Sequence, residues 1–441
     1  PPPPPTPPPI FAAAVIAPPP PPPPPIFAKV SDKPNEEAEA LFKKGIAYKN
    51  GSGVERNPEE AIKCITEASN MGHVKATFTL AQLYDNGNCV EKDKATAFKW
   101  YLKAAQLNHG DAQHIVGWKL EHGESVSVSI SEAIKWYQLA SAQGVLESIL
   151  QLAQCYALGS GVPANMTEAI RLWKLAVEQD DAESACYIGA AYNDGKGGVT
   201  KDPAEALKWF LIAAEKGSAA AQHQLGLLHS SGVGLTKDVS AAFGWFRKAA
   251  DQGYPPSQYE LGILLGAGIS GIRSDPQEAL EWLQKAAESG DKRAPDAIPQ
   301  AEYKVGQKFW YAGDKPQGVK WFQSAAEKGC VEAQCHFGRA LKSGQGVAKN
   351  PSEAAKWLKR AADKGNAQAQ FLLGGLYFSG SGVATDKTQA VKYFQLAAEQ
   401  GHNESNYNLG FCYGEGHGVP INKLEAIKWY QKAALRGNGQ A

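Results

Sequence analysis

Internal repetition constrains the fold of this chain more than any other feature. A unit of 36 to 37 residues occurs eleven times, with one irregular copy. The full pattern is a helix-forming segment with a small residue at its centre, a Gly-x-Gly-Val turn, an Asp or Asn, and a second segment ending in Ala-Ala and Gly, and single units depart from it at one or more positions. The tenth copy, Ala367–His402, shows the order of these parts. A unit of this length cannot bury its own apolar face, so consecutive units must stack.

Two positions hold the units in register. The first is the small central residue, which is Gly45, Ala81, Gly117, Ala153, Gly189, Gly226, Gly262, Gly306, Gly338, Gly374 or Gly410. The second is the polar residue Asn57, Asp93, Ser129, Asn165, Asp202, Asp238, Asp275, Asp314, Asn350, Asp386 or Asn422. The two lie 12 or 13 residues apart in ten units, which predicts helices of constant length that dock at constant positions.

Each unit predicts a hairpin of two helices, A and B. In helix A of the tenth unit, Phe371, Gly374 and Phe378 share one face, and the central glycine allows close approach of helix B. A glycine six residues later, found in ten units, suits the left-handed end of helix A. The polar residue then caps helix B. Helix B carries Trp in eight units, and we interpret this Trp series as core packed on small residues.

These residues resemble a known repeat family. The motifs Leu-Gly-x-x-Tyr, Gly-x-Gly-Val, Glu-Ala-x-Lys-Trp and Ala-Ala-Glu-Gln-Gly are similar to those of the Sel-one-like repeats, relatives of the tetratricopeptide repeat, over Glu37–Asn438. The resemblance implies an all-α fold, a right-handed α/α superhelix of about eleven helical hairpins. It also implies an adaptor or scaffold, since family members act in endoplasmic-reticulum quality control, activation of membrane enzymes, bacterial signalling and host contact.

Composition argues against several classes of partner. The chain has 45 basic and 45 acidic residues and no basic run, which disfavours nucleic acid. The longest apolar run, Ile10–Ala17, is too short to span a membrane and has no positive segment before it. Seven cysteines at unrelated positions of the repeat predict free thiols in a reducing compartment, which favours the cytoplasm over the endoplasmic-reticulum lumen.

No motif in the chain predicts catalysis. The glycine-rich turns follow helices and recur with the repeat, so they differ from phosphate-binding loops, which follow a strand and occur once. His73, His109 and His402 fall in turns between repeats and in no metalloprotease-like motif. Cys330, Cys335 and His336 do not have the spacing of a zinc site. We therefore expect no catalytic residue, cofactor or metal.

Partner binding is predicted on helix A, because helix A lines the concave groove of tetratricopeptide-like hairpins. Trp118 and Trp310 are aromatic residues outside the Trp series of helix B. Exposed rings at such places bind partners with a large contact area, whereas the alternative is that each ring fills a local gap. The candidate groove residues are Trp118, Glu121, His122, Trp310, Tyr311, Arg339, Lys342 and Phe378.

The eighth unit breaks the register. Gly306 and Asp314 are only 8 residues apart, as in an ordinary tetratricopeptide hairpin, and the interval before Gly306 is seven residues longer than elsewhere. The insertion is expected either to lengthen a loop or to change the direction of the superhelix. The predicted domains are a proline-rich tail at residues 1–36, repeats one to seven at 37–291, a linker or bend at 292–299, and repeats eight to eleven at 300–438.

The two ends carry separate expectations. The segment Pro-Pro-Pro-Ile-Phe-Ala occurs at Pro7–Ala12 and Pro23–Ala28, which predicts a ligand for a polyproline-binding module or a profilin-like protein, or else a stiff spacer. The eleventh unit matches the internal ones and has no polar capping variant. We therefore expect an open apolar face around Trp429 and Tyr430, covered by a partner, a second copy or further sequence.

The leading hypothesis is a non-enzymatic scaffold that holds a partner peptide or helix in the concave groove of the solenoid. One alternative is a structural subunit built permanently into a large assembly. Another is a regulatory or activator subunit of a membrane enzyme or a quality-control complex. Purification of the chain alone, or only together with partners, would separate the scaffold from the structural subunit.

Overall fold

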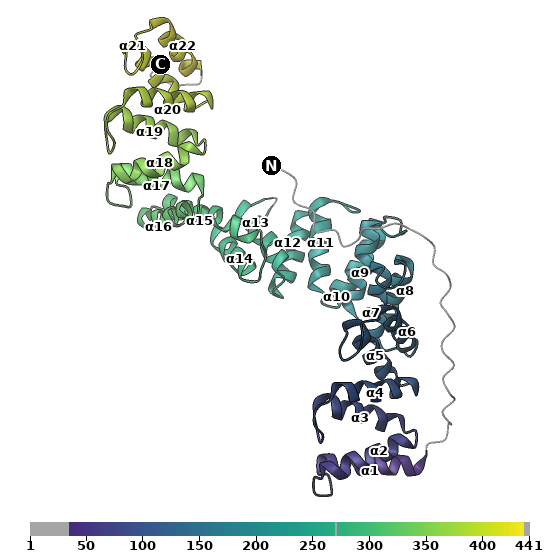
Figure 1. Ribbon diagram of the computed structural model, residues 1–441. Coiled ribbons are helices and arrows are strands. Elements are labelled where there is room, and N and C mark those ends of the chain that lie inside the picture. The colour runs from purple at the N-terminus through teal and green to yellow at the C-terminus, as the bar shows by residue number, and fades with distance from the viewer. Residues whose placement is uncertain (1–34, 270, 436–441) are drawn as a thin grey trace. The chain divides into compact units, whose positions relative to one another are not determined.

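The computed structural model describes residues 35–269 and 271–435, and over these ranges the protein consists of 22 α-helices and contains no strand (Figure 1). The predicted all-α solenoid of helical hairpins is therefore confirmed. The proline-rich segments Pro7–Ala12 and Pro23–Ala28 and the last residues of the eleventh repeat lie outside the described residues.

The chain divides into two compact units, Pro1–Lys237 and Asp238–Ala441, and the division falls inside the sixth repeat. The sequence predicts a division at residues 292–299 instead. Odd-numbered helices are A helices and even-numbered helices are B helices, and they alternate along each unit (Figure 1). Each hairpin packs on the next hairpin of its unit.

The first unit contains α1 (Glu36–Asn50), α2 (Pro58–Asn70), α3 (Val74–Asn86), α4 (Lys94–Gln106), α5 (Gly110–His122), α6 (Ile130–Ala142), α7 (Leu146–Leu158), α8 (Met166–Glu178), α9 (Ala182–Asp194), α10 (Pro203–Glu215) and α11 (Ala219–Ser231). The second unit contains α12 (Val239–Asp251), α13 (Pro255–Ala267), α14 (Pro276–Glu288), α15 (Ala294–Tyr311), α16 (Lys315–Glu327), α17 (Val331–Ser343), α18 (Pro351–Asp363), α19 (Ala367–Ser379), α20 (Lys387–Glu399), α21 (Asn403–Glu415) and α22 (Lys423–Leu435).

The helix ends follow the sequence signals. The glycine that follows helix A in ten repeats adopts the left-handed conformation. Gly380, for example, has φ +72°, where a side chain would be strained. The polar residue before helix B accepts hydrogen bonds from free amides of the first turn, as Asp386 does from the amide of Gln389. Ser129 is the exception, because its side chain makes no capping bond.

The central glycine of helix A lies against one large side chain of helix B, which is a ring in repeats such as the third and tenth and is Ile65, Leu283 or Leu358 in three others. A Cβ atom added to Gly374 would lie 2.8 Å from the ring of Phe394, and one added to Gly117 would lie 2.7 Å from Tyr137. The ring in this contact belongs to the residue after the Trp position. The Trp series forms the edge of the core, because Trp282 and Trp357 are buried, while Trp100, Trp136, Trp209, Trp321 and Trp429 are half-buried and pack against it.

The remaining Trp residues of the series are half-buried. In several repeats, a Lys three residues after the Trp covers one face of its ring. The amine of Lys432, for example, lies 3.9 Å from the ring centre of Trp429. The prediction that a large side chain of helix B packs on a small residue is confirmed. The large side chain in this contact is the residue after the Trp position, not the Trp itself.

The Gly-x-Gly-Val turn joins helices A and B of one hairpin, and it also contacts the preceding hairpin. Its second glycine lies against the N-terminus of the previous B helix, so a Cβ atom at Gly382 would lie 2.3 Å from the carbonyl carbon of Pro351. Gly346 and Gly418 lie in the same way against Lys315 and Lys387. These glycines therefore provide close contact between repeats as well as backbone freedom.

A buried glutamine of helix A makes a second connection between repeats. The side-chain amide of Gln370 donates to the carbonyl oxygen of Ala362, 3.2 Å away, near the end of the preceding B helix. Gln113, Gln222 and Gln334 donate to Ala105, Ala214 and Ala326 at 3.1 to 3.3 Å. Each of these carbonyl groups also accepts from an amide of the turn that follows its helix, as Ala362 does from Gly365, so the glutamine adds a second hydrogen bond.

The insertion before the eighth repeat forms helix, so the alternative of a longer loop at 292–299 is wrong. In the ordinary register, helix A begins seven residues before the central glycine, which places Pro299 at its first position, as Pro255 is in α13. Proline is well tolerated at a first helical position. In α15, residues 294–298 extend this helix at its N-terminus, and Pro299 becomes internal.

The turn contact predicts a large difference between two glycines with similar backbone angles. Gly382 and Gly365 have φ +76° and +90°, but a Cβ atom at Gly365 would meet nothing within 4 Å. We expect Gly365→Ala to cost about 1 kcal/mol from backbone strain. We expect Gly382→Ala to cost about 3 kcal/mol or more, because it also collides with Pro351. Denaturant unfolding of both variants measures this, and equal losses would contradict the contact.

Candidate functional site

The residue directly after each small central residue is exposed or half-buried and differs in type between repeats, and we call its place the row position. In the first unit these residues are Ile46, Gln82, Trp118, Gln154, Ala190 and Leu227. In the second unit they are Ile263, Gln307, Arg339, Gly375 and Phe411. Trp118, Ile263 and Phe411 are 39%, 39% and 38% exposed. Large apolar side chains at the row position therefore reach solvent.

Neighbouring A helices lie close to one another. Helix α9 contacts α11 in the first unit, and α13 contacts α15 and α17 contacts α19 in the second. Side chains at the row positions of such neighbours consequently share one surface, the A-helix surface. This surface is where the sequence places its candidate binding residues.

Trp118 and His122 form one exposed aromatic pair on α5. Their rings stack with centres 4.4 Å apart, and His122 Nδ1 donates to the carbonyl oxygen of Trp118 at 2.9 Å. The stack fixes the orientation of Trp118 while leaving much of its ring in solvent. Such a ring offers contact area at low entropic cost, and its role in binding stays a prediction.

Glu121 lies on the same helix but bonds within the protein. It accepts hydrogen bonds from the hydroxyl of Tyr137 at 2.6 Å and from the side-chain amide of Gln151 at 3.1 Å. The carboxylate thus joins three consecutive helices, α5, α6 and α7. These bonds support a structural role beside the predicted binding role.

The buried Lys119, also on α5, has no counterpart in the sequence prediction. It is 2% exposed and donates to Glu124 at 2.7 Å and to Asp85 of the preceding repeat at 3.4 Å. Lys119 and Lys94 hold the pKa of Glu124 down to about 2. The cluster links repeats two and three, since the buried ammonium has acidic partners from both.

Trp310 and Tyr311 differ strongly in environment. Trp310 is half-buried, with its ring centre 5.7 Å from that of Phe322, and the amine of Lys315 covers its other side. Tyr311 is 75% exposed at the end of α15. The contacts of Trp310 support the gap-filling alternative for this residue.

Arg339 and Lys342 add positive charge to the A-helix surface of the second unit. Both lie half-buried on α17, and neither has an acidic group within ion-pair distance among the described residues. Burial lowers the pKa of Lys342. These two cations are therefore available to an acidic group from outside the chain.

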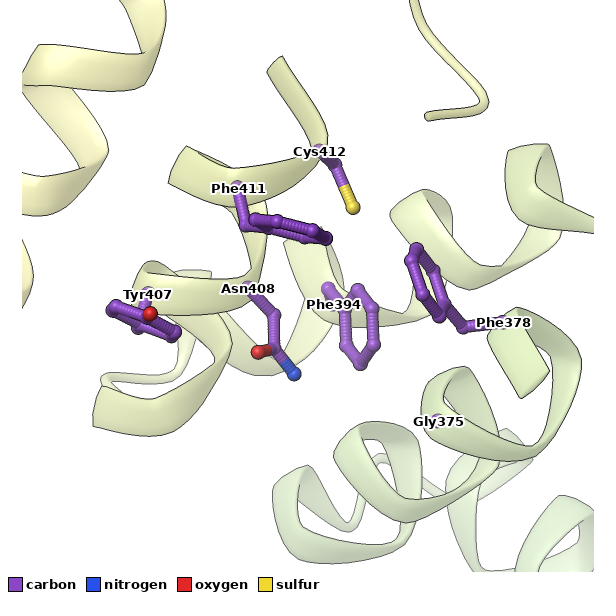
Figure 2. A pocket seen from close by; sticks show the side chains of 7 residues that line it. All are labelled: Gly375, Phe378, Phe394, Tyr407, Asn408, Phe411 and Cys412. Carbon is purple, nitrogen blue, oxygen red and sulfur yellow. The ribbon is translucent and has the colours of Figure 1, made fainter. Parts of the chain in front are cut away.

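Phe378 lines a cavity of about 340 Å³ between α19 and α21. Figure 2 shows Phe378, Phe394 and Phe411 around one space, with the amide of Asn408 beside them. Gly375, Tyr407 and Cys412 complete the lining. Burial raises the pKa of Cys412 to about 11, so its thiol stays protonated near neutral pH.

Sequence reasoning identified only Phe378 among the residues of this cavity. Two signals could have found the rest: Phe411 has the same register as Trp118, and Gly375 is an additional glycine directly after the central Gly374. Neither signal is visible in one repeat alone, because each is a departure from the other ten.

The last helix of the repeat array leaves apolar side chains open. Ile427 is 52% exposed, whereas Val391 and Ile170, which stand at the same position of helix B, are 4% and 6% exposed under the following repeat. Trp429 and Tyr430 are half-buried, since Lys432 covers Trp429 and Tyr430 packs on Gly410. What covers this face stays a prediction.

The described residues contain neither a group of side chains suited to a metal ion nor a membrane-spanning helix. No three His, Cys, Asp or Glu side chains are grouped so that they could hold a metal ion. Nor is any described helix both long enough and apolar enough to cross a membrane.

The comparison with protein families gives matches along nearly the whole array. The family model of the Sel1 repeat matches eleven consecutive segments, at residues 38–73, 74–109, 110–145, 146–181, 182–218, 219–254, 255–291, 299–330, 331–366, 367–402 and 403–438. The eighth match begins at residue 299, the first residue of the ordinary register in α15. A search of the curated proteins found no significant match.

Solved structures with this repeat are similar to the chain. The protective antigen c5321 of uropathogenic Escherichia coli, which displays an SLR fold, is 30% identical over 92% of this chain and 85% of its own, with a TM-score of 0.59. A Sel1 repeat protein from Oxalobacter formigenes is 32% identical over 58% of this chain and 99% of its own, with a TM-score of 0.45.

The environments of the two tryptophans predict different effects on stability. We expect Trp310→Ala to lower the free energy of unfolding by about 3 kcal/mol, because it removes a ring packed on Phe322. We expect Trp118→Ala to cost less than about 1 kcal/mol, because its ring contacts mainly His122. Thermal unfolding followed by circular dichroism compares them. A larger loss for Trp118→Ala would assign that ring to the core.

His336 predicts a pH dependence of stability. Gln307 donates to the oxygen of Tyr303, and the Tyr303 hydroxyl lies 2.7 Å from Nδ1 of the half-buried His336, so the neutral ring has a hydrogen-bond partner, whereas a charged ring would be poorly solvated there. Burial, and secondarily Arg339, lower the His336 pKa from 6.5 to about 4, while Glu332 acts in the opposite direction. The unfolded chain therefore binds this proton first, and the stabilisation is complete above pH 6.5 and lost as the pH falls toward 4.

The variant His336→Gln removes this titration and keeps a hydrogen-bond acceptor, and Gln151 and Gln224 occupy the same register in other repeats. Between pH 7 and pH 5 we expect the wild type to lose about 2 kcal/mol more stability than His336→Gln. Denaturant unfolding at both pH values tests this, with the other histidines common to both proteins. Parallel losses would show that His336 does not titrate as described.

Proposed function

Because this chain belongs to the Sel1 repeat family, we propose that it is a non-enzymatic scaffold that binds an extended peptide or a helix of a partner protein along its A helices. Sel1 repeat proteins are generally protein-interaction scaffolds. The repeat fixes the backbone and leaves the row positions free to vary, so each protein of this kind can present its own set of side chains to a partner.

One observation carries the proposal, which is the exposure of large rings at the row position. Trp118 and Phe411 occupy the same register in repeats three and eleven, and more than a third of each ring residue is exposed. Polar, small or aliphatic residues stand at this register in the other repeats. An exposed aromatic residue on a rigid helix is a typical anchor for a protein partner.

The exposed face of α22 supports the alternative of a structural subunit in a larger assembly. Leu424 and Ile427 are 76% and 52% exposed there, and a further apolar surface would bury them. The alternative of a regulatory subunit of a membrane enzyme or quality-control complex rests on the family resemblance. Both alternatives also need a protein partner, so they differ from the scaffold mainly in how permanent the association is.

The proposal is tested by capture of partners on the full chain and on two variants. We expect Trp118→Ala to reduce recovery of specific partners at least about tenfold, the scale of a single hot-spot residue. Val128→Ala is the matched control, because Val128 is 61% exposed but lies in the loop after α5. Quantitative mass spectrometry of the captured proteins measures the difference. Equal recovery with all three proteins would contradict binding through Trp118.

A further inference from the structure

A missing side chain opens the cavity beside Phe378. Each of the other ten row positions carries a side chain, whereas the tenth repeat has Gly375. A Cβ atom at Gly375 would meet only the amine of Lys342, at 4.0 Å, so nothing else occupies this space. The cavity is thus a place where the side chain of the row position is missing, and it lies on the A-helix surface of the second unit.

The walls of the cavity are aromatic and held in place. The ring centres of Phe378 and Phe411 are 6.2 Å apart, and His417 packs edge-on against both at 5.5 and 5.4 Å. Phe394 closes the base, where it is buried against Gly374. Because Phe378, Phe394 and His417 have these partners, the cavity does not collapse when it is empty.

Polar groups lie at the rim. The amine of Lys342 is close to Gly375, and Arg339 lies one turn before it on α17. The amide of Asn408 points into the same space and makes no hydrogen bond within the described part of the chain. Two cations without acidic partners beside an apolar cavity fit a ligand that combines an apolar group with a carboxylate.

We propose that this cavity is an anchor pocket for one bulky apolar side chain, such as Phe or Leu, of a partner peptide that carries an acidic residue next to it. The apolar side chain enters the space over Gly375, where it lies against the contacting rings of Phe378 and Phe411, and the neighbouring carboxylate pairs with Lys342 or Arg339. The proposal rests on the scaffold function and identifies the kind of peptide that this part of the surface recognises.

The size of the cavity agrees with such a ligand. A cavity of about 150 Å³ is enough to hold benzene. The space of about 340 Å³ therefore takes an aromatic side chain together with part of its backbone, and it is partly open to solvent, as an anchor pocket must be. Burial lowers the pKa of Lys342, and an incoming carboxylate would oppose that effect.

Filling the cavity is the most direct test. Gly375→Leu places a side chain in the space, at a helical position where a Cβ atom fits without a clash. Gly244→Leu is the matched control, because Gly244 lies exposed on α12 and a Cβ atom there also meets nothing within 4 Å. Both variants exchange glycine for a good helix former, so both should fold with unchanged or higher melting temperature.

Four synthetic peptides serve as probes, and saturation-transfer NMR measures their binding to the full chain. The first is acetyl-Ala-Glu-Phe-Glu-Ala-amide. The second has Ala for Phe, the third has Lys for both Glu residues, and the fourth is acetyl-Pro-Pro-Pro-Ile-Phe-Ala-amide, the sequence found twice near the N-terminus. We expect the first peptide to bind at least about tenfold more tightly than the second and the third.

We also expect the first peptide to lose at least about tenfold in affinity to Gly375→Leu and to keep its affinity for Gly244→Leu within about twofold. Lys342→Met, which keeps the length of the side chain, should weaken the first peptide and should not weaken the third, which carries no carboxylate. Equal binding of the first and third peptides, or tighter binding of the fourth, would overturn the acidic requirement. Unchanged binding to Gly375→Leu would overturn the pocket itself.

These outcomes are separate from a failure of the scaffold function. The probes bind or do not bind to the pocket of the second unit whether or not Trp118 in the first unit recruits partners. If Trp118→Ala loses its partners while the peptides ignore Gly375→Leu, the scaffold function stands and the pocket is wrong. If the peptides recognise the pocket while Trp118→Ala retains every partner, the pocket stands and the assignment of Trp118 is wrong.

Discussion

The contact between the small central residue of helix A and one large side chain of helix B is the interaction on which the hairpins depend. Without a Cβ atom at Gly374, the ring of Phe394 lies directly on the backbone of helix A, and the carbonyl oxygen of Ala390 approaches it closely. The two helices are therefore packed at short distance, as in interiors with crystal-like density. Because the contact recurs in register, every hairpin offers the same shape to the next one.

Connections between hairpins then use groups that cannot change freely. The second turn glycine, as at Gly382, lies against the backbone of the previous B helix, and the buried amide of Gln370 donates to the carbonyl oxygen of Ala362. The first connection needs a residue without a side chain, and the second needs an amide donor at a buried position. The contacts between helices A and B and those of the turns thus fix how the hairpins stack, whereas the row positions take part in neither kind of contact.

Freedom at the row positions is what allows a uniform array to have distinct surfaces. Trp118 adds a ring to the surface, and Gly375 removes a side chain and leaves a cavity between Phe378 and Phe411. Neither change disturbs the contact between helices A and B, because the row side chains point away from it. Binding properties can therefore vary from repeat to repeat without loss of the fold.

The sequence by itself determined the repeat, the two helices of each unit, their caps and the absence of strands in the described chain, because these depend on local spacing and on glycine and proline geometry. It misplaced the buried ring by one residue and allowed a loop where Ala294–Ile298 extends α15, since burial and helix continuation depend on neighbouring hairpins. It identified Trp118 and Trp310 as exceptions to the pattern and Phe378 as a candidate groove residue, but it did not identify Phe411 or Gly375. Only the tertiary structure showed that Glu121 is engaged with Tyr137 and that a missing side chain opens a cavity, because contacts between adjacent repeats decide which side chains remain available.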